Sequence, residues 1–183
     1  MEDTTKDQPC CWICMEEENL LSVCSCPRPV HQLCLAKWQV NNIGGDEENR
    51  CRFCNSSFPD WRSTFTIPDE APLKTPFRVV FNGQMHKIEV NEDNYEDFVK
   101  EVRRIYNITD DQEFDVVYTC NVPNEKNKVM LNTSKDNKRQ YIFQTAVHLA
   151  KCGSKKKPDD LNPEHQHKPF SLRRTIQSVF SRE

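Results

Sequence analysis

The residues most able to carry chemistry in this 183-residue chain are cysteines near its beginning. Eight of the ten cysteines lie between residues 10 and 54, and seven of them form four close pairs with one histidine. Two ligands at such short spacing can converge on a metal ion at about 2.0–2.3 Å. Four pairs complete two four-coordinate sites with no open position for water, which predicts two structural Zn²⁺ ions rather than a hydrolytic centre. The pairs are Cys11 and Cys14, Cys24 and Cys26, His31 and Cys34, and Cys51 and Cys54.

Other uses of these thiols fit the sequence less well. Disulfides belong to oxidising compartments, whereas residues 1–9 are acidic and lack the apolar segment of a secretory signal. No βαβ pattern surrounds either Cys-x-x-Cys pair, which argues against a thioredoxin-like site. Cys10 is a ninth candidate ligand, but Cys11 has the two-residue gap to Cys14 and is the better choice.

The composition excludes several classes of protein. No apolar run approaches the roughly 18 residues of a membrane span. The net charge is −3, and only residues 153–183 carry a clear positive excess, so nucleic-acid binding is not expected. Four glycines leave no glycine-rich phosphate loop. We expect a reducing, cytoplasmic location, with a membrane-peripheral or nuclear location as the alternatives.

The cysteine-rich segment has too little apolar surface to fold alone. A segment of about 50 residues buries a small fraction of its surface, and domains of this size often need a metal. Zinc supplies roughly 10–16 kcal/mol of apparent binding energy per site at pH 7. The sequence therefore predicts that this segment unfolds when its metal is chelated.

The ligand order and the residues between the ligands resemble the RING-CH, or variant RING, family of ubiquitin ligases over residues 10–60. The Cys-Trp-Ile-Cys sequence at 11–14, followed by acidic residues, is similar to the family's opening, and HQLCLAKW at 31–38 resembles its HxxCLxxW segment. The resemblance implies a cross-brace, in which the first and third pairs share one zinc and the second and fourth share the other. It also implies a helix over about 32–40 that ends in the Asn- and Gly-rich segment 41–45.

The resemblance implies a RING-CH-type E3 ubiquitin-protein transferase. Similar domains bind a ubiquitin-charged conjugating enzyme in a shallow apolar groove, and they position the thioester for attack by a substrate lysine. They have no catalytic nucleophile of their own, so no catalytic residue is expected. The expected partners are therefore the charged conjugating enzyme and a protein substrate. By position in the motif, the residues that bind the conjugating enzyme are Ile13, Trp38, Pro27 and Phe53.

A non-enzymatic zinc module is the alternative. PHD fingers use the same C4HC3 ligand order and bind histone tails, and the short gap of four residues between Cys26 and His31 fits them. PHD fingers usually place an aromatic residue two positions before the seventh ligand, where this chain has Asn49. The tryptophan follows the sixth ligand instead, which favours the RING-CH interpretation. A RING domain that only scaffolds other proteins is a second form of this alternative.

The remainder of the chain predicts a second domain over residues 77–152. Prolines make residues 61–76 a semi-rigid linker. Beyond it, alternating and helical apolar spacing follow each other in the order ββαββα. The expected strands are 77–81, 84–90 after an Asn-Gly hairpin turn, 114–118 and 128–132; the expected helices begin after Asn94 and Ser134.

This order resembles the ubiquitin-like β-grasp fold, and the motifs resemble its Phox/Bem (PB1) subgroup. Such domains pair through a basic patch, for which Arg78 and Lys87 are the candidates, so PB1-type pairing or self-association is possible. The turn after Tyr118 lacks the carboxylates of the acidic face, and a solvated scaffold is the alternative. The predicted fold class is therefore α+β: a cross-brace RING-CH domain, a PB1-like β-grasp domain, and a disordered basic tail over 153–183 with a short amphipathic helix.

Overall fold

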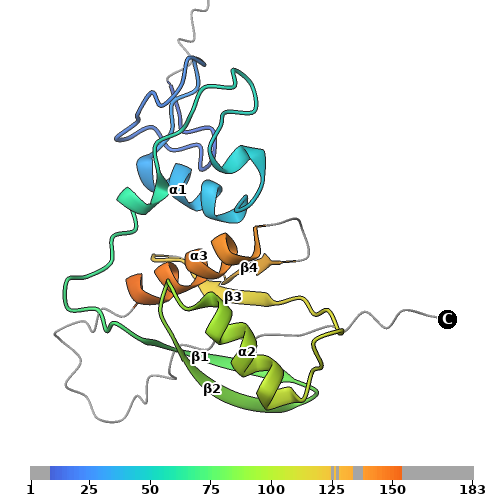
Figure 1. Ribbon diagram of the computed structural model, residues 1–183. Coiled ribbons are helices and arrows are strands. Elements are labelled where there is room, and N and C mark those ends of the chain that lie inside the picture. Colours follow the sequence, from blue (N-terminus) through green and yellow to red (C-terminus); the bar gives the residue numbers. More distant parts are fainter. Residues whose placement is uncertain (1–8, 125, 127, 134–137, 154–183) are drawn as a thin grey trace, which may run out of the picture. The chain divides into compact units, whose positions relative to one another are not determined.

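The computed structural model describes residues 9–124, 126, 128–133 and 138–153. The chain divides between Thr66 and Ile67 into two units, which are described separately here (Figure 1). The first unit holds the cysteine-rich segment and the second holds all the β-strands that the structure describes. None of the helices in the described residues is long and apolar enough to cross a membrane.

The first unit has little regular secondary structure. Its one α-helix among the described residues is α1 (Gln32–Asn41), preceded by His31 at the N-cap, and two single-turn 3-10 helices follow at Asp46–Glu48 and Trp61–Ser63. The helix agrees with the expected range to within one residue. Gly44 follows it with φ of +81°, a left-handed conformation that suits glycine. Because α1 begins at a predicted ligand pair, the helix fixes the direction of both side chains.

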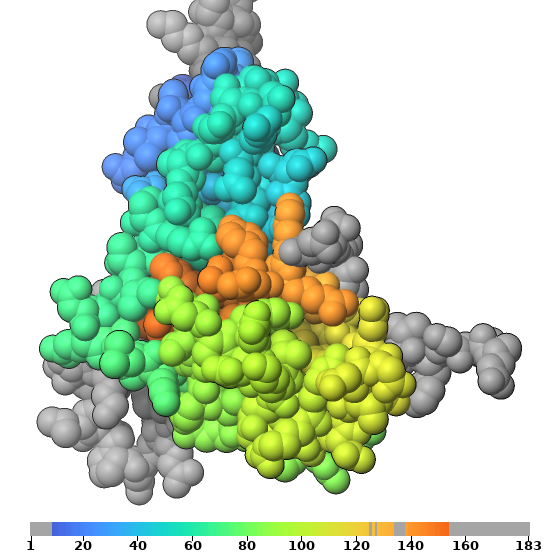
Figure 2. All heavy atoms as spheres, in the orientation of Figure 1, coloured from blue at the N-terminus to red at the C-terminus, as the bar shows by residue number. Residues whose placement is uncertain are grey.

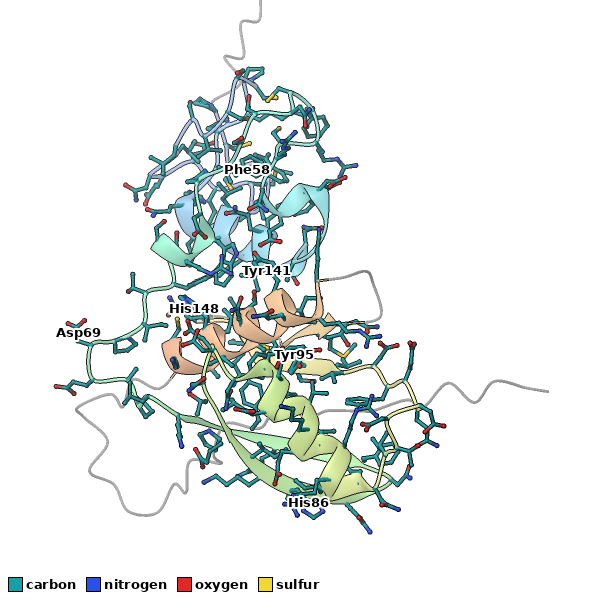
Figure 3. The ribbon with its side chains drawn as sticks, viewed as in Figure 1. Phe58, Asp69, His86, Tyr95, Tyr141 and His148 are labelled. Atoms are coloured by element: carbon teal, nitrogen blue, oxygen red, sulfur yellow. The ribbon has the colours of Figure 1, made fainter. Side chains whose placement is uncertain are left out.

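The second unit consists of two antiparallel hairpins and two helices, in the expected order ββαββα. The first hairpin turns at Asn82 and Gly83, both with positive φ, as a type I′ turn requires. His86, labelled in Figure 3, lies on the second strand of this hairpin. Its ring packs edge-on against that of Tyr106, with the ring centroids 5.3 Å apart. The elements are β1 (Thr75–Phe81), β2 (Gln84–Val90), α2 (Tyr95–Tyr106), β3 (Val117–Asn121), β4 (Lys128–Asn132) and α3 (Arg139–Cys152).

Four aromatic rings form the centre of the second unit. Phe77 of β1, Phe98 of α2, Tyr118 of β3 and Phe143 of α3 are each no more than 1% exposed. Their ring centroids lie 5.1–6.5 Å apart, within the range of favourable aromatic pairs. Figure 2 shows α2 at the surface of this unit, where Glu96, Asp97, Lys100 and Arg104 are exposed. The ring cluster therefore joins four elements that are distant in the sequence.

Two of the four strands differ from their expected bounds. The first strand begins at Thr75 and takes in the end of the predicted linker. The third spans Val117–Asn121 rather than residues 114–118, because the ladder to β4 covers those positions. Val116 is buried like a strand residue, but its backbone N–H donates to the Thr133 hydroxyl at 2.8 Å rather than to a strand. The buried residues just before β3 show the same apolar pattern as the strand itself, so periodicity alone misplaced the start of this strand.

The β-grasp and PB1-like assignment is not confirmed. Among the described strands, β1 pairs with β2 and β3 pairs with β4, and no ladder joins the two hairpins into one sheet. The predicted cap Ser134, the acidic segment 1–8 and the tail 154–183 with its amphipathic helix lie outside the described residues. What the structure supports is a mixed α and β content in the part of the chain that follows the cysteine-rich unit in sequence.

Candidate metal centres and the pocket beside them

The two Cys-x-x-Cys segments adopt the same backbone turn. The N–H of Met15 donates to the carbonyl of Cys11, and the N–H of Asn55 donates to the carbonyl of Cys51, both at 2.8 Å. Met15 and Asn55 have φ of +64° and +60°, a left-handed conformation that is unfavourable for residues with a side chain. Such a turn directs both cysteine side chains of a pair toward one point. Because the same strained turn occurs at both Cys-x-x-Cys pairs, we interpret it as part of the ligand sites.

The first and third ligand pairs meet in one cluster. The ligand atoms of Cys11, Cys14, His31 and Cys34 all lie within 4.8 Å of one another. Nδ1 of His31 is 3.2 Å from the Cys14 sulfur and 3.6 Å from the Cys34 sulfur. The opposite ring nitrogen, Nε2, contacts the carbonyl of Glu18. Nε2 therefore carries the ring proton and donates a hydrogen bond to the Glu18 carbonyl. This bond fixes the ring orientation and leaves Nδ1 as the nitrogen that faces the metal site.

The second and fourth pairs meet in another cluster. The sulfurs of Cys24, Cys26, Cys51 and Cys54 also lie within 4.8 Å of one another, and those of Cys26 and Cys51 are 3.8 Å apart. Alternate pairs along the chain thus converge, which is the cross-brace that the family resemblance implies. Because the two clusters interleave in sequence, neither can form without bending the segment that carries the other.

The chemistry of the donor set fits zinc. The Ser56 hydroxyl lowers the pKa of Cys54 to about 6, whereas hydrogen bonding to Cys54, with burial, raises the pKa of Cys26 to about 12. In the other cluster, burial and the neighbouring sulfurs raise the pKa of Cys34 to about 12. Sulfurs this close cannot all ionise unless a cation balances them. Thiolates with at most one imidazole suit tetrahedral Zn²⁺, so both clusters are compatible with structural zinc.

A small apolar cluster supports the first ligand cluster. Cys11, Val30 and Leu35 are buried, and partly buried side chains, Ile13 among them, pack around them. The short strap before His31 is held in place because Val30 exchanges two backbone hydrogen bonds of 2.9 Å with Leu21. The four residues between Cys26 and His31 are therefore enough to connect the two ligand clusters.

A buried polar network joins α1 to the segments around Glu48 and Trp61. Sequence analysis did not find this network. Glu48 is 2% exposed, and its carboxylate accepts hydrogen bonds from the Gly44 N–H at 2.9 Å and the Trp61 indole N–H at 3.3 Å. The buried side chain of Gln39 on α1 donates to the carbonyls of Glu48 and Pro59 at 2.8 and 2.9 Å. Residues 61–66, the start of the predicted semi-rigid linker, therefore belong to this unit.

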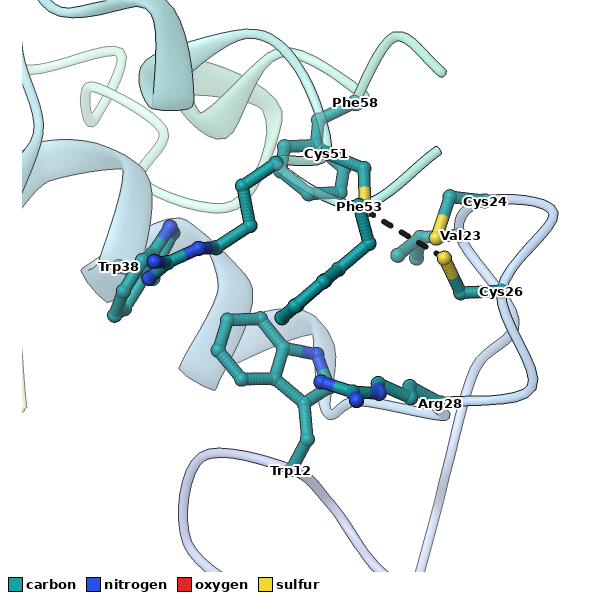
Figure 4. A pocket seen from close by; sticks show the side chains of 10 residues that line it. Trp12, Val23, Cys24, Cys26, Arg28, Trp38, Cys51, Phe53 and Phe58 are labelled. Atoms are coloured by element: carbon teal, nitrogen blue, oxygen red, sulfur yellow. Dashed lines mark hydrogen bonds between the residues drawn. The ribbon is translucent and has the colours of Figure 1, made fainter. Parts of the chain in front are cut away.

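A pocket at the second cluster is lined by three of that cluster's cysteines and by two of the four predicted docking residues, Trp38 and Phe53 (Figure 4). Trp12 meets Trp38 edge-on, with ring centroids 5.1 Å apart at 74°. Phe53 is 56% exposed, which is unusual for a large aromatic side chain. The rest of the lining consists of Val23, Arg28, Arg52, Phe58 and the cysteines Cys24, Cys26 and Cys51.

The other two predicted docking residues do not line this pocket. Ile13 is half-buried and packs against the apolar cluster, whereas Pro27 is exposed. Trp12 and Arg28, their immediate neighbours in sequence, line the pocket instead. The available signal was Trp12 itself, a large aromatic residue between two ligands in a segment too small to bury it fully.

The two predicted partner-binding residues of the second unit lie side by side. Arg78 and Lys87 are directly opposite each other in the β1–β2 ladder. Arg78 is half-buried, and Lys87 is exposed and forms an ion pair of 2.8 Å with Glu89. The hairpin thus carries two adjacent cations, of which one is partly neutralised.

Comparison with known proteins agrees with the geometry of the first unit. Residues 11–54 match the family model of the RING-variant domain, a span that begins and ends on the first and last cluster cysteines. No curated protein matches the chain. The match supports the RING-CH interpretation over the PHD alternative, because the ligand order alone did not separate the two. Residues 11–54 are therefore a RING-variant (RING-CH) domain with two Cys/His clusters in C4HC3 order.

Proposed function

We propose that the chain is a RING-type ubiquitin-protein ligase. Its RING-variant domain binds a ubiquitin-charged conjugating enzyme and positions the thioester for transfer to a substrate lysine. The observation that carries the proposal is the pocket, which Trp38 and the exposed Phe53 both line next to ligands of the second cluster. Exposed aromatic side chains on a rigid frame are typical anchors of protein interfaces. This mode of catalysis requires positioning alone, and no nucleophile on the ligase takes part.

The ligand clusters give this docking surface its rigidity. Phe53 lies between the ligands Cys51 and Cys54, and Trp38 is one turn beyond Cys34 on α1. Zinc bound at the two clusters would hold these ligands in place and would thereby fix the positions of Phe53 and Trp38. Ile13 and Pro27 remain proposed contacts at the margin of the surface.

The second unit is proposed to choose the protein substrate or to control assembly. The adjacent Arg78 and Lys87 offer a positive surface to an acidic partner, either another protein in PB1-type pairing or a second copy. We place the protein in the cytoplasm, where reducing conditions keep thiols available as zinc ligands.

An autoubiquitination assay of the zinc-loaded full chain against a panel of conjugating enzymes tests the proposal. Phe53→Ala should reduce the rate by roughly tenfold or more, as expected for a central interface anchor. Because the Phe53 ring is 56% exposed, its removal should leave the fold and a content of two zinc ions intact. Leu21→Ala is the matched control, since Leu21 is 45% exposed on the same unit and does not line the pocket.

The opposite result would overturn the ligase function. A wild-type protein with two bound zinc ions that neither binds nor activates any conjugating enzyme would be a scaffolding module. Histone-peptide binding by that protein would point to PHD-like recognition instead.

A further inference from the structure

The pocket is bordered by two arginines as well as by aromatic rings. The guanidinium carbon of Arg28 lies 4.1 Å from the centroid of the Phe53 ring, and that of Arg52 lies 5.5 Å from it. Arg28 extends across the pocket toward Phe53 (Figure 4). A purely apolar groove would bind any apolar side chain of suitable size. The two positive charges can therefore distinguish between partners that differ in charge.

The two arginines differ in the charge around them. Arg52 has a carboxylate partner, Glu47, at 3.8 Å. Within the described residues, Arg28 has no carboxylate at ion-pair distance, and its guanidinium lies over the face of the Phe53 ring. A guanidinium has five N–H donors, and stacking on a ring uses none of them. Among the described residues, nothing neutralises the charge of Arg28 or uses its N–H donors, and the side chain lies at an exposed position.

Stacking also prepares Arg28 for one kind of ligand. Contact with an aromatic face is worth about 0.5–1 kcal/mol at an exposed site and restricts the long side chain. A guanidinium held flat directs its donor edge outward, and that edge matches the two oxygens of a carboxylate. The cost of ordering the side chain is then smaller when a partner binds.

We propose that this pocket selects conjugating enzymes whose docking loop carries an Asp or Glu beside an apolar tip. The inference rests on the ligase function proposed above. The apolar side chain packs against Trp38 and Phe53, and the carboxylate pairs with Arg28. A conjugating enzyme with Lys or Arg at that loop position is disfavoured by like-charge repulsion, so Arg28 acts as a specificity-determining residue.

Charge reversal on both sides of the contact tests the proposal. Arg28→Glu in the zinc-loaded full chain should weaken binding of an acidic-loop conjugating enzyme by about tenfold, measured by calorimetry at low salt. Replacing the loop carboxylate by Lys should weaken binding to the wild type and restore binding to Arg28→Glu. Arg50→Glu is the matched control, because Arg50 is exposed on the same unit and does not line the pocket.

Each outcome decides between stated explanations. Loss of binding in Phe53→Ala, with no effect of Arg28→Glu and no rescue, would refute the charge selection and leave the ligase proposal standing. Failure of the wild type to bind any conjugating enzyme would refute both. If deletion of residues 1–8 removes the effect of Arg28→Glu, the acidic N-terminal segment is the occupant and the proposed selection is wrong.

Discussion

The interiors of the two units consist of different kinds of side chain. In the first, the cysteine clusters lie among a few buried aliphatic side chains, such as Val30 and Leu35. In the second, four buried aromatic rings contact one another across two strands and two helices. A fold organised by ligands depends on the presence of the metal, whereas a fold organised by apolar burial depends on shape and volume. The same chain should therefore respond to chelation and to core mutation in separate places.

Chelation should give the largest effect. Removing zinc withdraws roughly 10–16 kcal/mol per site, more than a domain of this size holds in reserve, so the first unit should unfold while the second persists. The sequence supplies separate probes, because all three tryptophans lie in the first unit and all four tyrosines in the second. Tryptophan fluorescence should shift to the solvent-exposed wavelength while near-UV tyrosine dichroism is retained. Simultaneous loss of both signals would show that the units are not independent.

Phe143→Ala should produce the reverse pattern. Phe143 is fully buried and packs its ring against those of Phe77, Phe98 and Tyr118. Its truncation leaves a cavity and should cost about 3–5 kcal/mol of the free energy of unfolding of the second unit. Urea unfolding followed by the tyrosine signal measures this loss. Zinc content and tryptophan fluorescence should not change, and a change in either would count against the separation of the two interiors.

Glu48→Ala should weaken the first unit without removing its metal. The substitution leaves the Trp61 and Gly44 N–H groups without their acceptor, at a cost of about 1–3 kcal/mol for each buried group. Urea unfolding followed by tryptophan fluorescence should show this loss, with two zinc ions still bound. Glu47→Ala is the matched control. Glu47 is the adjacent residue in sequence, and its carboxylate makes only a long, exposed ion pair with Arg52. Equal destabilisation by both variants would contradict the buried network.

The features that sequence analysis predicted well depend on residues close together in the chain. Ligand spacing, the helix after His31 and the Asn82-Gly83 turn are local, so the sequence was enough to place them. The Glu48–Trp61 hydrogen bond joins residues 13 positions apart, and nothing in a polar run marks one carboxylate as buried. The pocket shows the same limit: Trp12 and Ile13 both pack against the apolar cluster, and nothing in the motif marks Trp12 as the one that also lines the pocket.

The smallest expected effect comes from a surface pair in the second unit, which tests whether charges matter there as they do in the first. The side chain of Arg104 donates to Glu101 on α2 at 2.6 Å, and this hydrogen bond lowers the pKa of the Glu101 carboxyl. A lowered pKa means that the pair stabilises the fold above the ordinary carboxyl pKa, and that this contribution disappears as the pH falls through the folded-state value. Arg104→Ala should raise the pKa of Glu101 in an NMR titration, while the urea midpoint hardly moves because exposed pairs contribute little. A clear drop in the midpoint would mean that surface charge, and not only the ring cluster, holds the second unit together.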